Sequence, residues 1–198
     1  AVGALPYLLE VIEATVFGTE LTIELASLLA KERGLADRLE NFFKIDEEVE
    51  IEFEDANVSF FRTTHTIPDS VGIVIQTKEG SIVYTGDFRI DPSAKPLYKT
   101  HFGRLTDIGE SGVLALLADS SEAESHVENV SDQQAADEIL ETFRNAHGRV
   151  IVACVGSNIA RLQQVMDAAH TSKRTIFVPG GELMDIVDTA IKLDKLVM

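Results

Sequence analysis

A histidine stands between two predicted strands, in a loop where it can face a cleft. It is His65, in the run Thr63-Thr64-His65-Thr66-Ile67-Pro68-Asp69-Ser70. A neutral imidazole at a strand end is a good ligand for a first-row transition metal. The alternative is a histidine that only hydrogen-bonds loop backbone.

An aspartate ends the next predicted strand. Asp87 lies in the run Thr85-Gly86-Asp87-Phe88, where Gly86 permits a tight turn that projects the carboxylate from the strand end. A carboxylate in that position can bridge two cations about 3.5–4 Å apart. The alternative is an Asx turn or a helix cap.

Asp119 repeats this arrangement, because it follows the apolar run 113–118. It can serve as a general acid or as a polar partner that orients a metal ligand, and the alternative is a helix N-cap. Since His65, Asp87 and Asp119 each follow an apolar strand, we expect all three at one edge of a sheet. One histidine and two aspartates there indicate half of a dinuclear hydrolase site.

A second polar turn, Gly156-Ser157-Asn158, precedes a predicted helix. Backbone N–H groups at such a helix start can hold a phosphate. The alternative is a plain strand-to-helix turn, because the glycine patterns of dinucleotide-binding and P-loop motifs are missing. The single cysteine, Cys154, is predicted to be a core residue, and its being single excludes a disulfide framework and a cysteine-rich zinc site.

Two hydrophobic periodicities predict the elements that position these residues. Helical spacing predicts helices over 4–13, 20–31, 35–42 and 100–110. Period-two alternation predicts an antiparallel meander over 44–87, with strands at 49–53, 58–61, 71–77 and 81–85. Short apolar runs predict a further strand at 15–18 and a buried strand at 113–117.

The last third of the chain alternates between helix and strand. The predicted order is helix 132–147, strand 149–155, helix 158–170, strand 174–178 and helix 181–194. Such alternation is typical of a Rossmann-like parallel sheet. The polar, turn-rich stretch 119–131 predicts a domain boundary, which gives one domain over 1–125 and a second over 126–198.

The composition is that of a globular protein, with 45% hydrophobic and 25% charged residues among 198. With no run of about 18 apolar residues and no secretory signal, we expect a soluble, cytoplasmic protein without a membrane partner. The net charge is −16, and residues 1–60 carry 4 basic and 14 acidic side chains. This balance argues against non-specific nucleic-acid binding, but it does not exclude a phosphodiesterase whose metal ions face the phosphates.

Five segments resemble the ribonuclease J family, in order and spacing, over essentially the whole chain. They are Gly-Ala-Leu-Pro-Tyr-Leu-Leu (3–9), Thr-Thr-His-Thr-Ile-Pro-Asp-Ser (63–70), Val-Tyr-Thr-Gly-Asp-Phe-Arg (83–89), Leu-Ala-Leu-Leu-Ala-Asp-Ser (114–120) and Val-Ile-Val-Ala-Cys-Val-Gly-Ser-Asn (150–158). The resemblance implies an α/β fold, in which a partial metallo-β-lactamase αββα sandwich is followed by the start of a Rossmann-like β-CASP domain. It also implies a 5′-to-3′ exonuclease and endonuclease that acts on 5′-monophosphorylated RNA, in RNA maturation and decay, with two Zn²⁺ or Mn²⁺ ions.

The same resemblance implies a role for each matching residue. His65 resembles a histidine that binds one metal ion, and Asp87 resembles the aspartate that bridges both ions. Asp119 resembles the acidic residue that opens the β-CASP motifs, and we expect Asp87 and Asp119 to be catalytic. Ser157 and Asn158 resemble part of the edge that faces RNA.

Ala1 departs from the family pattern. In active members a His-x-His-x-Asp-His motif runs directly into the segment that matches Val2–Pro6, so its last histidine falls at position 1, where this sequence has alanine. The rest of that motif is expected upstream of this sequence. An alanine there most resembles the second ribonuclease J paralog of Gram-positive bacteria, which is associated with a degenerate site, weak activity and assembly with its active sister enzyme.

Three functions therefore stay open. The first is a metal-dependent ribonuclease of weak activity. The second is a largely non-catalytic subunit that stabilises or tunes an active ribonuclease J partner, in a homo- or hetero-oligomer. The third is another hydrolase on the same scaffold, such as a thioesterase or a lactamase, because a fold does not fix a function.

Overall fold

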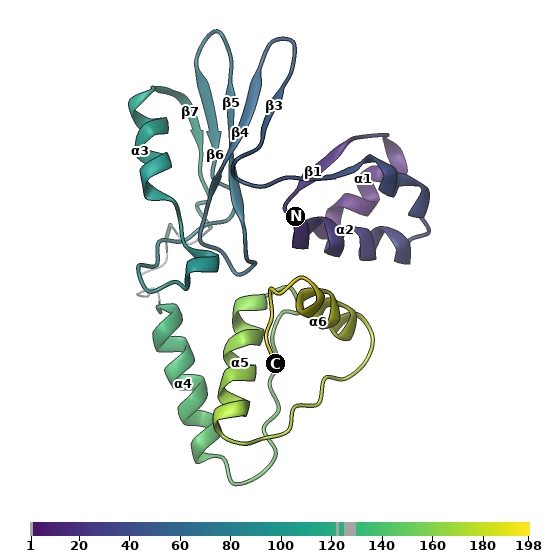
Figure 1. Cartoon of the computed structure of the whole chain (residues 1–198), viewed down its shortest axis with the longest axis vertical. Coiled ribbons are helices and arrows are strands. Elements are labelled where there is room, and N and C mark those ends of the chain that lie inside the picture. Colours follow the sequence, from purple (N-terminus) through teal and green to yellow (C-terminus); the bar gives the residue numbers. More distant parts are fainter. Residues whose placement is uncertain (1, 122, 125–129) are drawn as a thin grey trace. The chain divides into compact units, whose positions relative to one another are not determined.

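A computed structural model describes residues 2–121, 123–124 and 130–198 (Figure 1). The chain divides into two compact units: the first holds the chain up to Asp46 together with Val178–Val197, and the second holds Glu47–Phe177 and Met198. The domain boundary predicted between residues 125 and 126 and the departure at Ala1 both lie outside the described residues. Among the residues described, no helix is long and apolar enough to cross a membrane.

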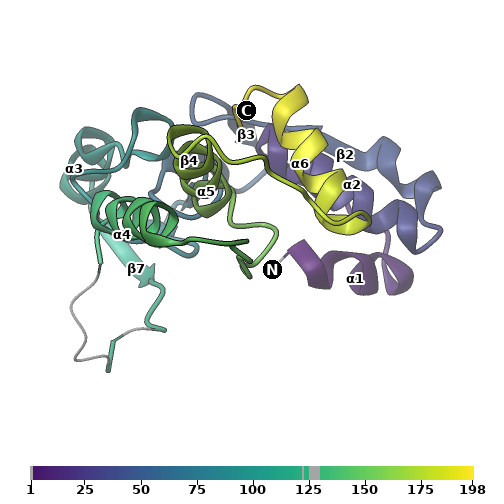
Figure 2. The ribbon, with the colours of Figure 1, turned by 90° about the horizontal axis from the view of Figure 1, so that it is seen from below.

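The first unit is mainly helical. Its elements are η1 (Val2–Ala4), α1 (Leu5–Val11), β1 (Val16–Gly18), α2 (Glu20–Glu32), η2 (Ala36–Asn41), β2 (Phe42–Lys44) and α6 (Glu182–Lys192). β1 and β2 pair in parallel. α2 contacts α1 and α6 and buries Leu21 and Leu25, so a helix from the far end of the chain completes this core (Figure 2). The helix predicted over 35–42 forms as a 3₁₀ helix.

The second unit is built on a five-stranded sheet (Figure 1). In spatial order the strands are β3 (Glu50–Glu52), β4 (Asn57–Arg62), β5 (Val71–Gln76), β6 (Ser81–Tyr84) and β7 (Val113–Leu117). The first four form the predicted antiparallel meander, and β7 pairs with β6 in parallel. The connection between β6 and β7 contains η3 (Pro96–Tyr98) and α3 (Phe102–Glu110), in keeping with the crossover that a parallel pair requires.

One core of this unit lies between the sheet and α3. Leu105 and Ile108 of α3 pack on a buried cluster of Phe61, Val74 and Val83. These three residues come from three neighbouring strands, so the antiparallel register places them on one face. The strand ends that carry the candidate site are held by this core.

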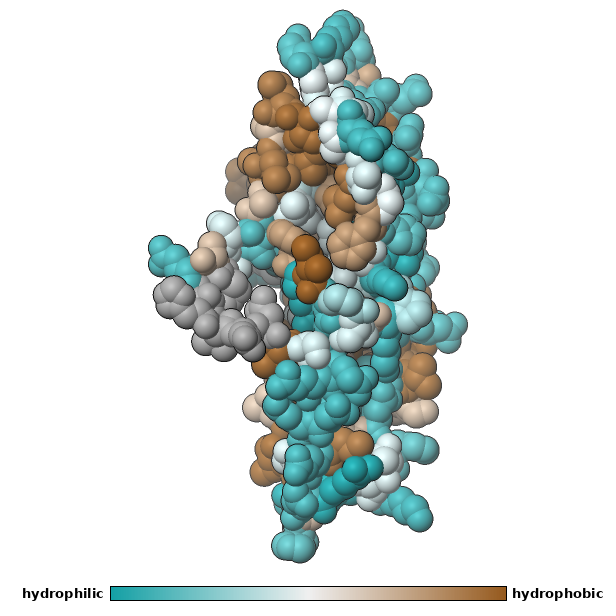
Figure 3. Space-filling view, turned by 90° about the vertical axis from the view of Figure 1, so that its left-hand side faces the viewer, coloured by the Kyte–Doolittle hydropathy of each residue, from teal (hydrophilic) through white to brown (hydrophobic). Residues whose placement is uncertain are grey.

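β7 is a strand where the sequence predicts one, but its predicted burial is wrong. All five of its residues are exposed, and Leu114 and Leu116 retain 65% and 63% of their accessible surface. β7 is the edge strand and is hydrogen-bonded on one side only, so a hydrophobic run does not by itself place a strand inside a sheet. Figure 3 shows hydrophobic residues gathered above the grey atoms, in the part of the sheet that includes β7.

Two helices complete the second unit. α4 (Asp132–Asn145) and α5 (Ile159–Thr171) pack together through Phe143, Ala168 and Ala169 (Figure 2). Ser131 is the N-cap of α4, and its side chain accepts a hydrogen bond from the Gln134 backbone N–H. Both helices begin close to where they are predicted.

The predicted strands at 149–155 and 174–178 are wrong. Neither segment pairs with a strand in the described part of the chain, so the parallel sheet predicted for 132–198 does not form there. A strand needs a neighbour to satisfy its backbone groups, and an apolar run does not supply that neighbour. Ile151 and Val155 are 87% and 70% exposed, and Cys154, predicted to be a core residue, is exposed as well.

The end of α5 gives a first testable prediction. Lys173 has a left-handed backbone with φ 53°, a conformation that glycine adopts without the steric cost of a Cβ. We expect Lys173→Gly to raise the free energy of unfolding by about 0.5–1 kcal/mol, measured by urea denaturation. Lys173→Ala keeps the Cβ and is the control, for which we expect no gain. Equal effects of the two variants would contradict the argument.

Candidate functional site

The loop that carries His65 is fixed at its base by buried hydroxyl groups. Thr64 directly precedes His65, and both its backbone N–H and its hydroxyl lie 2.9 Å from the Thr100 hydroxyl oxygen. The Thr63 N–H donates to the Ser70 carbonyl at 2.8 Å and closes the loop. The sequence therefore folds 65–69 as a short projection from the end of β4.

The turn that carries Asp87 requires the glycine before it. Gly86 has φ 61°, in the left-handed region that side chains disfavour. The buried residue Thr85 connects this turn to the end of β7, because its N–H donates to Leu117 and its hydroxyl accepts from the Asp119 N–H at 3.1 Å. The ends of β6 and β7 thus place Asp87 and Asp119 on neighbouring turns.

His65 and Asp87 meet at this edge of the sheet. Nε2 of His65 lies 3.8 Å from Oδ2 of Asp87, and the two side chains are 33% and 70% exposed. Burial lowers the pKa of His65, with a further contribution from the positive charge of Arg89, although Asp87 and Asp119 act in the opposite direction. The imidazole is therefore neutral at neutral pH, which is the form that binds a metal ion.

Asp119 lies within electrostatic reach of His65, but its carboxylate also has a local role. Its Oδ1 accepts the Ser121 N–H at 2.9 Å, an Asx-type arrangement rather than the helix N-cap considered as the alternative to a catalytic role. Hydrogen bonds from Ser121, and further contributions from the Phe88 N–H and the charge of His65, lower the pKa of Asp119. The carboxylate is therefore ionised, and its charge acts on His65, while its position in one metal site with His65 and Asp87 stays a prediction.

These side chains fit part of a metal site. A neutral imidazole and a carboxylate, side by side and partly exposed, are suitable donors for Zn²⁺ or Mn²⁺. No group of three His, Cys, Asp or Glu side chains that could hold a metal ion occurs among the described residues. His65 and Asp87 thus supply two donors of a coordination sphere that needs at least one more.

The structure also brings the polar turn 156–158 next to the loop that carries His65. The Ala160 N–H, in the first turn of α5, donates to the Thr66 carbonyl at 3.1 Å. Asn158 is the N-cap of α5, and its Oδ1 accepts the Arg161 N–H at 2.9 Å, so this oxygen has the structural role of a cap. A phosphate bound at this turn would therefore contact other groups, such as the exposed Ser157.

Sequence reasoning assigned no role to the residues that follow Asp87. Asp91 accepts hydrogen bonds from the Ser93 N–H and hydroxyl and from the Asp132 N–H at the start of α4. Arg89 forms an ion pair with the Asp132 carboxylate, with 2.5 Å between Nη2 and Oδ1. Only the run Asp87-Phe88-Arg89-Ile90-Asp91, with its three charged residues, could have indicated this segment.

Asp91 gives a second prediction, a dependence of stability on pH. Burial alone would raise the pKa of Asp91, but hydrogen bonds from Ser93 and Asp132 outweigh burial and lower this pKa below 3.8. The native state therefore binds the proton less readily than the unfolded state, so the stabilisation is complete well above pH 3.8 and is lost as the pH falls below it.

We expect Asp91→Asn to lower the free energy of unfolding by about 1.5–3 kcal/mol at pH 7, because one charged acceptor oxygen becomes an NH2 donor and the other becomes a neutral acceptor. The difference from wild type should shrink as the pH falls from 5 to 3, measured by urea denaturation at each pH. The exposed residue Asp107 provides the control Asp107→Asn. A difference that stays constant down to pH 3 would refute the role of the charge.

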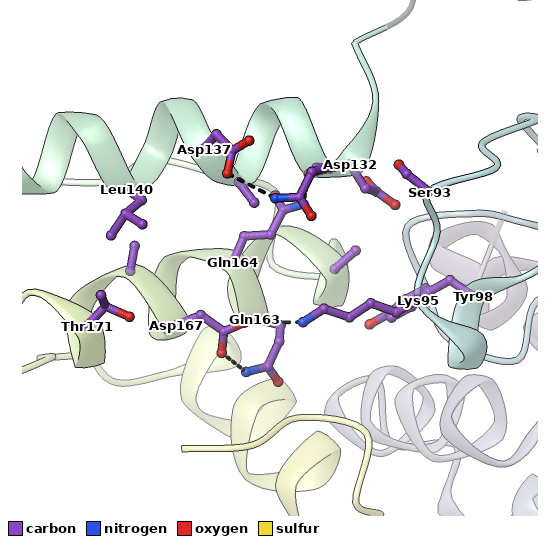
Figure 4. A pocket seen from close by; sticks show the side chains of 14 residues that line it. Ser93, Lys95, Tyr98, Asp132, Asp137, Leu140, Gln163, Gln164, Asp167 and Thr171 are labelled. Carbon is purple, nitrogen blue, oxygen red and sulfur yellow. Dashed lines mark hydrogen bonds and ion pairs between the residues drawn. The ribbon is translucent and has the colours of Figure 1, made fainter.

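A pocket of about 250 Å³ lies between α4, α5 and the segment 93–98. Figure 4 shows Lys95 and Tyr98 on one side of it and Asp132, Gln164 and Asp167 on the other. Lys95 is paired with Asp167 at 3.2 Å. None of the predicted site residues lines this pocket.

The sequence and the structure were both compared with those of known proteins. A family model described as "Ribonuclease J, beta-CASP domain" matches residues 147–198. A crystal structure of a protein of unknown function from Enterococcus faecalis V583 aligns with a TM-score of 0.65 and 13% identity, over 89% of this chain and 43% of that one, and shows a likeness of fold. The chain thus has the predicted mixed α/β fold, part of the metallo-β-lactamase and β-CASP architecture.

Curated relatives give the family. "Ribonuclease J 2" of Streptococcus pyogenes serotype M3 is 50% identical over all of this chain, which covers 36% of that protein. "Ribonuclease J 2" of Staphylococcus epidermidis is 38% identical over 98% of this chain, which covers 34% of it. The chain belongs to the ribonuclease J family, and it spans about a third of the length of these relatives.

Proposed function

We propose that the protein is a metal-dependent ribonuclease and that His65 and Asp87 belong to its metal site. The observation that carries this proposal is the approach of the His65 imidazole to the Asp87 carboxylate, 3.8 Å apart at one sheet edge, in a chain of the ribonuclease J family. A divalent cation, Zn²⁺ or Mn²⁺, would supply charge stabilisation at the phosphoryl group that reacts.

Each of the predicted site residues has a proposed role. Asp87 and His65 would hold the metal ions, with Asp87 shared between two ions and His65 on one, and Asp119 would contribute negative charge that acts on His65. The exposed Ser157 and the cap residue Asn158 lie on the turn whose helix is fixed to the His65 loop, so RNA held at this turn would be close to the reacting phosphate. We propose 5′-monophosphorylated RNA as the substrate, cut from the 5′ end and internally.

The experiment follows decay of a 5′-monophosphorylated, 3′-labelled RNA by the intact protein, with Mn²⁺ and with EDTA. Progressive loss from the 5′ end that requires Mn²⁺ supports the exonuclease, and internal fragments support the endonuclease. No decay above the EDTA control would contradict a catalytic role. Ester and lactam substrates in parallel address the alternative hydrolase, which turnover of these compounds without RNA cleavage would support.

A second function is favoured by the charge and by the residue at position 1. The net charge is −16, whereas an RNA-binding surface is generally basic, and alanine stands where the family resemblance predicts a histidine ligand. On this reading the protein is a largely non-catalytic subunit that stabilises or tunes an active ribonuclease J paralog. Sedimentation of the two purified proteins tests it, because the subunit hypothesis requires a heteromer.

A further inference from the structure

We propose that Arg89 is a positioning residue that fastens the loops of His65 and Asp87 to the start of α4. The inference rests on the proposed metal site and extends it to a residue that does not touch the metal. It depends on three connections within the second unit, two made by Arg89 and one that fixes its partner Asp132.

The first connection joins the two ligand loops. The Arg89 N–H donates to the Thr64 carbonyl at 3.0 Å, and the two residues form an isolated antiparallel bridge. Thr64 precedes His65 by one residue and Arg89 follows Asp87 by two. A shift of the Arg89 backbone therefore changes the separation of the two donor side chains.

The second connection joins this bridge to α4. The Arg89 guanidinium binds the Asp132 carboxylate through Nη2 at 2.5 Å, and these side chains are 31% and 17% exposed. An ion pair that is partly removed from solvent fixes geometry better than an exposed one. Asp132 is the first residue of α4, so the pair anchors Arg89 to a rigid element.

The third connection joins α4 to α5 and to the segment after Arg89. Gln164 of α5 donates through Nε2 to the Asp132 carbonyl at 3.0 Å, and Asp91 accepts the Asp132 N–H at 2.7 Å. Figure 4 shows Asp132 and Gln164 side by side at one end of the pocket. Asp132 is thus fixed through its N–H, its carbonyl and its carboxylate, which makes it a firm anchor for Arg89.

The test measures Mn²⁺ affinity by electron paramagnetic resonance in the intact protein. Removal of a residue that orients a metal ligand typically lowers metal affinity about 10–100-fold. We therefore expect Arg89→Gln and Asp132→Asn to raise the Mn²⁺ dissociation constant about tenfold. Only Nη2 takes part in the ion pair, and Nε has no partner among the described residues, so Arg89→Lys should restore most of the affinity.

A matched control comes from the neighbouring ion pair. Lys95 and Asp167 also join the segment after Asp87 to a helix, but their side chains are 62% and 53% exposed. Lys95→Gln should therefore leave Mn²⁺ affinity within about twofold of wild type. Equal losses in Lys95→Gln and Arg89→Gln would overturn the proposal, because any link to the helices would then suffice.

A second readout separates this inference from the proposed function. Hydrogen exchange at the backbone amide of residue 89 reports the bridge to Thr64 and should speed up in Arg89→Gln and in Asp132→Asn. If the wild type binds no Mn²⁺, the proposed function fails, and amide exchange alone decides the positioning role. Unchanged exchange and unchanged affinity in Asp132→Asn, a nearly isosteric variant, would overturn that role even if Arg89→Gln failed to fold.

Discussion

Asp87→Ala is expected to abolish Mn²⁺-dependent cleavage of RNA by the intact protein. Removal of a residue that only orients a metal ligand lowers metal affinity or activity about 10–100-fold. Loss of a ligand that bridges two ions should therefore lower kcat/KM by more than about a hundredfold. Asp87 is 70% exposed, so its replacement should leave the fold intact. The measurement is the rate of decay of 3′-labelled RNA, with circular dichroism to confirm folding.

The matched control is another aspartate of the same sheet. Asp55 lies in the turn between β3 and β4, where its 3.5 Å ion pair with Lys78 has both side chains 82% exposed. Asp55→Ala should retain full activity, because exposed ion pairs contribute little. Equal activity of Asp87→Ala and wild type would contradict the metal-site assignment. Measurable activity in wild type that Asp87→Ala lacks would show that the site functions in spite of Ala1.

Several strands, turns and helices of this fold could be predicted because the residues that determine each of them are close together in the sequence. Val49, Ile51 and Phe53 alternate with glutamates, and Lys78-Glu79-Gly80 gives the turn between β5 and β6, where Gly80 has φ 142°. Leu21 and Leu25 give the helical stripe that α2 buries. In each case the pattern that predicts the element lies within it or directly beside it in the sequence.

The failed predictions concern partners that lie far away in sequence. The run 149–155 has strand composition, but strand formation also requires a neighbour for its backbone, and the described residues provide none. The burial of β7 fails for the same reason, because a sequence does not reveal which strand lies at an edge. Propensity describes a segment, whereas pairing is a property of two segments.

The candidate site likewise has local features that the sequence predicts and a long-range contact that it does not. Asp87 could be predicted because a strand, a glycine and a carboxylate are consecutive, and the position of His65 after β4 is equally local. Their approach to 3.8 Å follows from the sheet order, which the meander makes predictable. The pair Arg89–Asp132 spans 43 positions and joins a loop to a helix start, so no periodicity reports it.

Gly72→Ala is expected to lower the free energy of unfolding by about 3 kcal/mol, although it adds a single methyl group. Gly72 lies opposite Phe61 in the β4–β5 ladder, and a Cβ at Gly72 would lie 2.2 Å from Cζ of the Phe61 ring. Phe61 is 1% exposed and belongs to the cluster beneath α3, so the ring has little room to move. Urea denaturation gives the measurement.

Two further variants show whether the loss comes from this contact. Gly109→Ala makes the same change in α3, where a Cβ meets nothing within 4 Å, and it should stabilise the protein by up to about 1 kcal/mol through helix propensity. Phe61→Leu combined with Gly72→Ala should be more stable than Gly72→Ala alone, because the smaller side chain relieves the overlap. If the two changes instead add independently, the ring of Phe61 is not what excludes a side chain at position 72. If the double variant is more stable than Gly72→Ala, the Phe61 ring on the neighbouring strand is what requires glycine at position 72. This pair then helps to hold the ends of β4 and β5 from which the His65 loop projects.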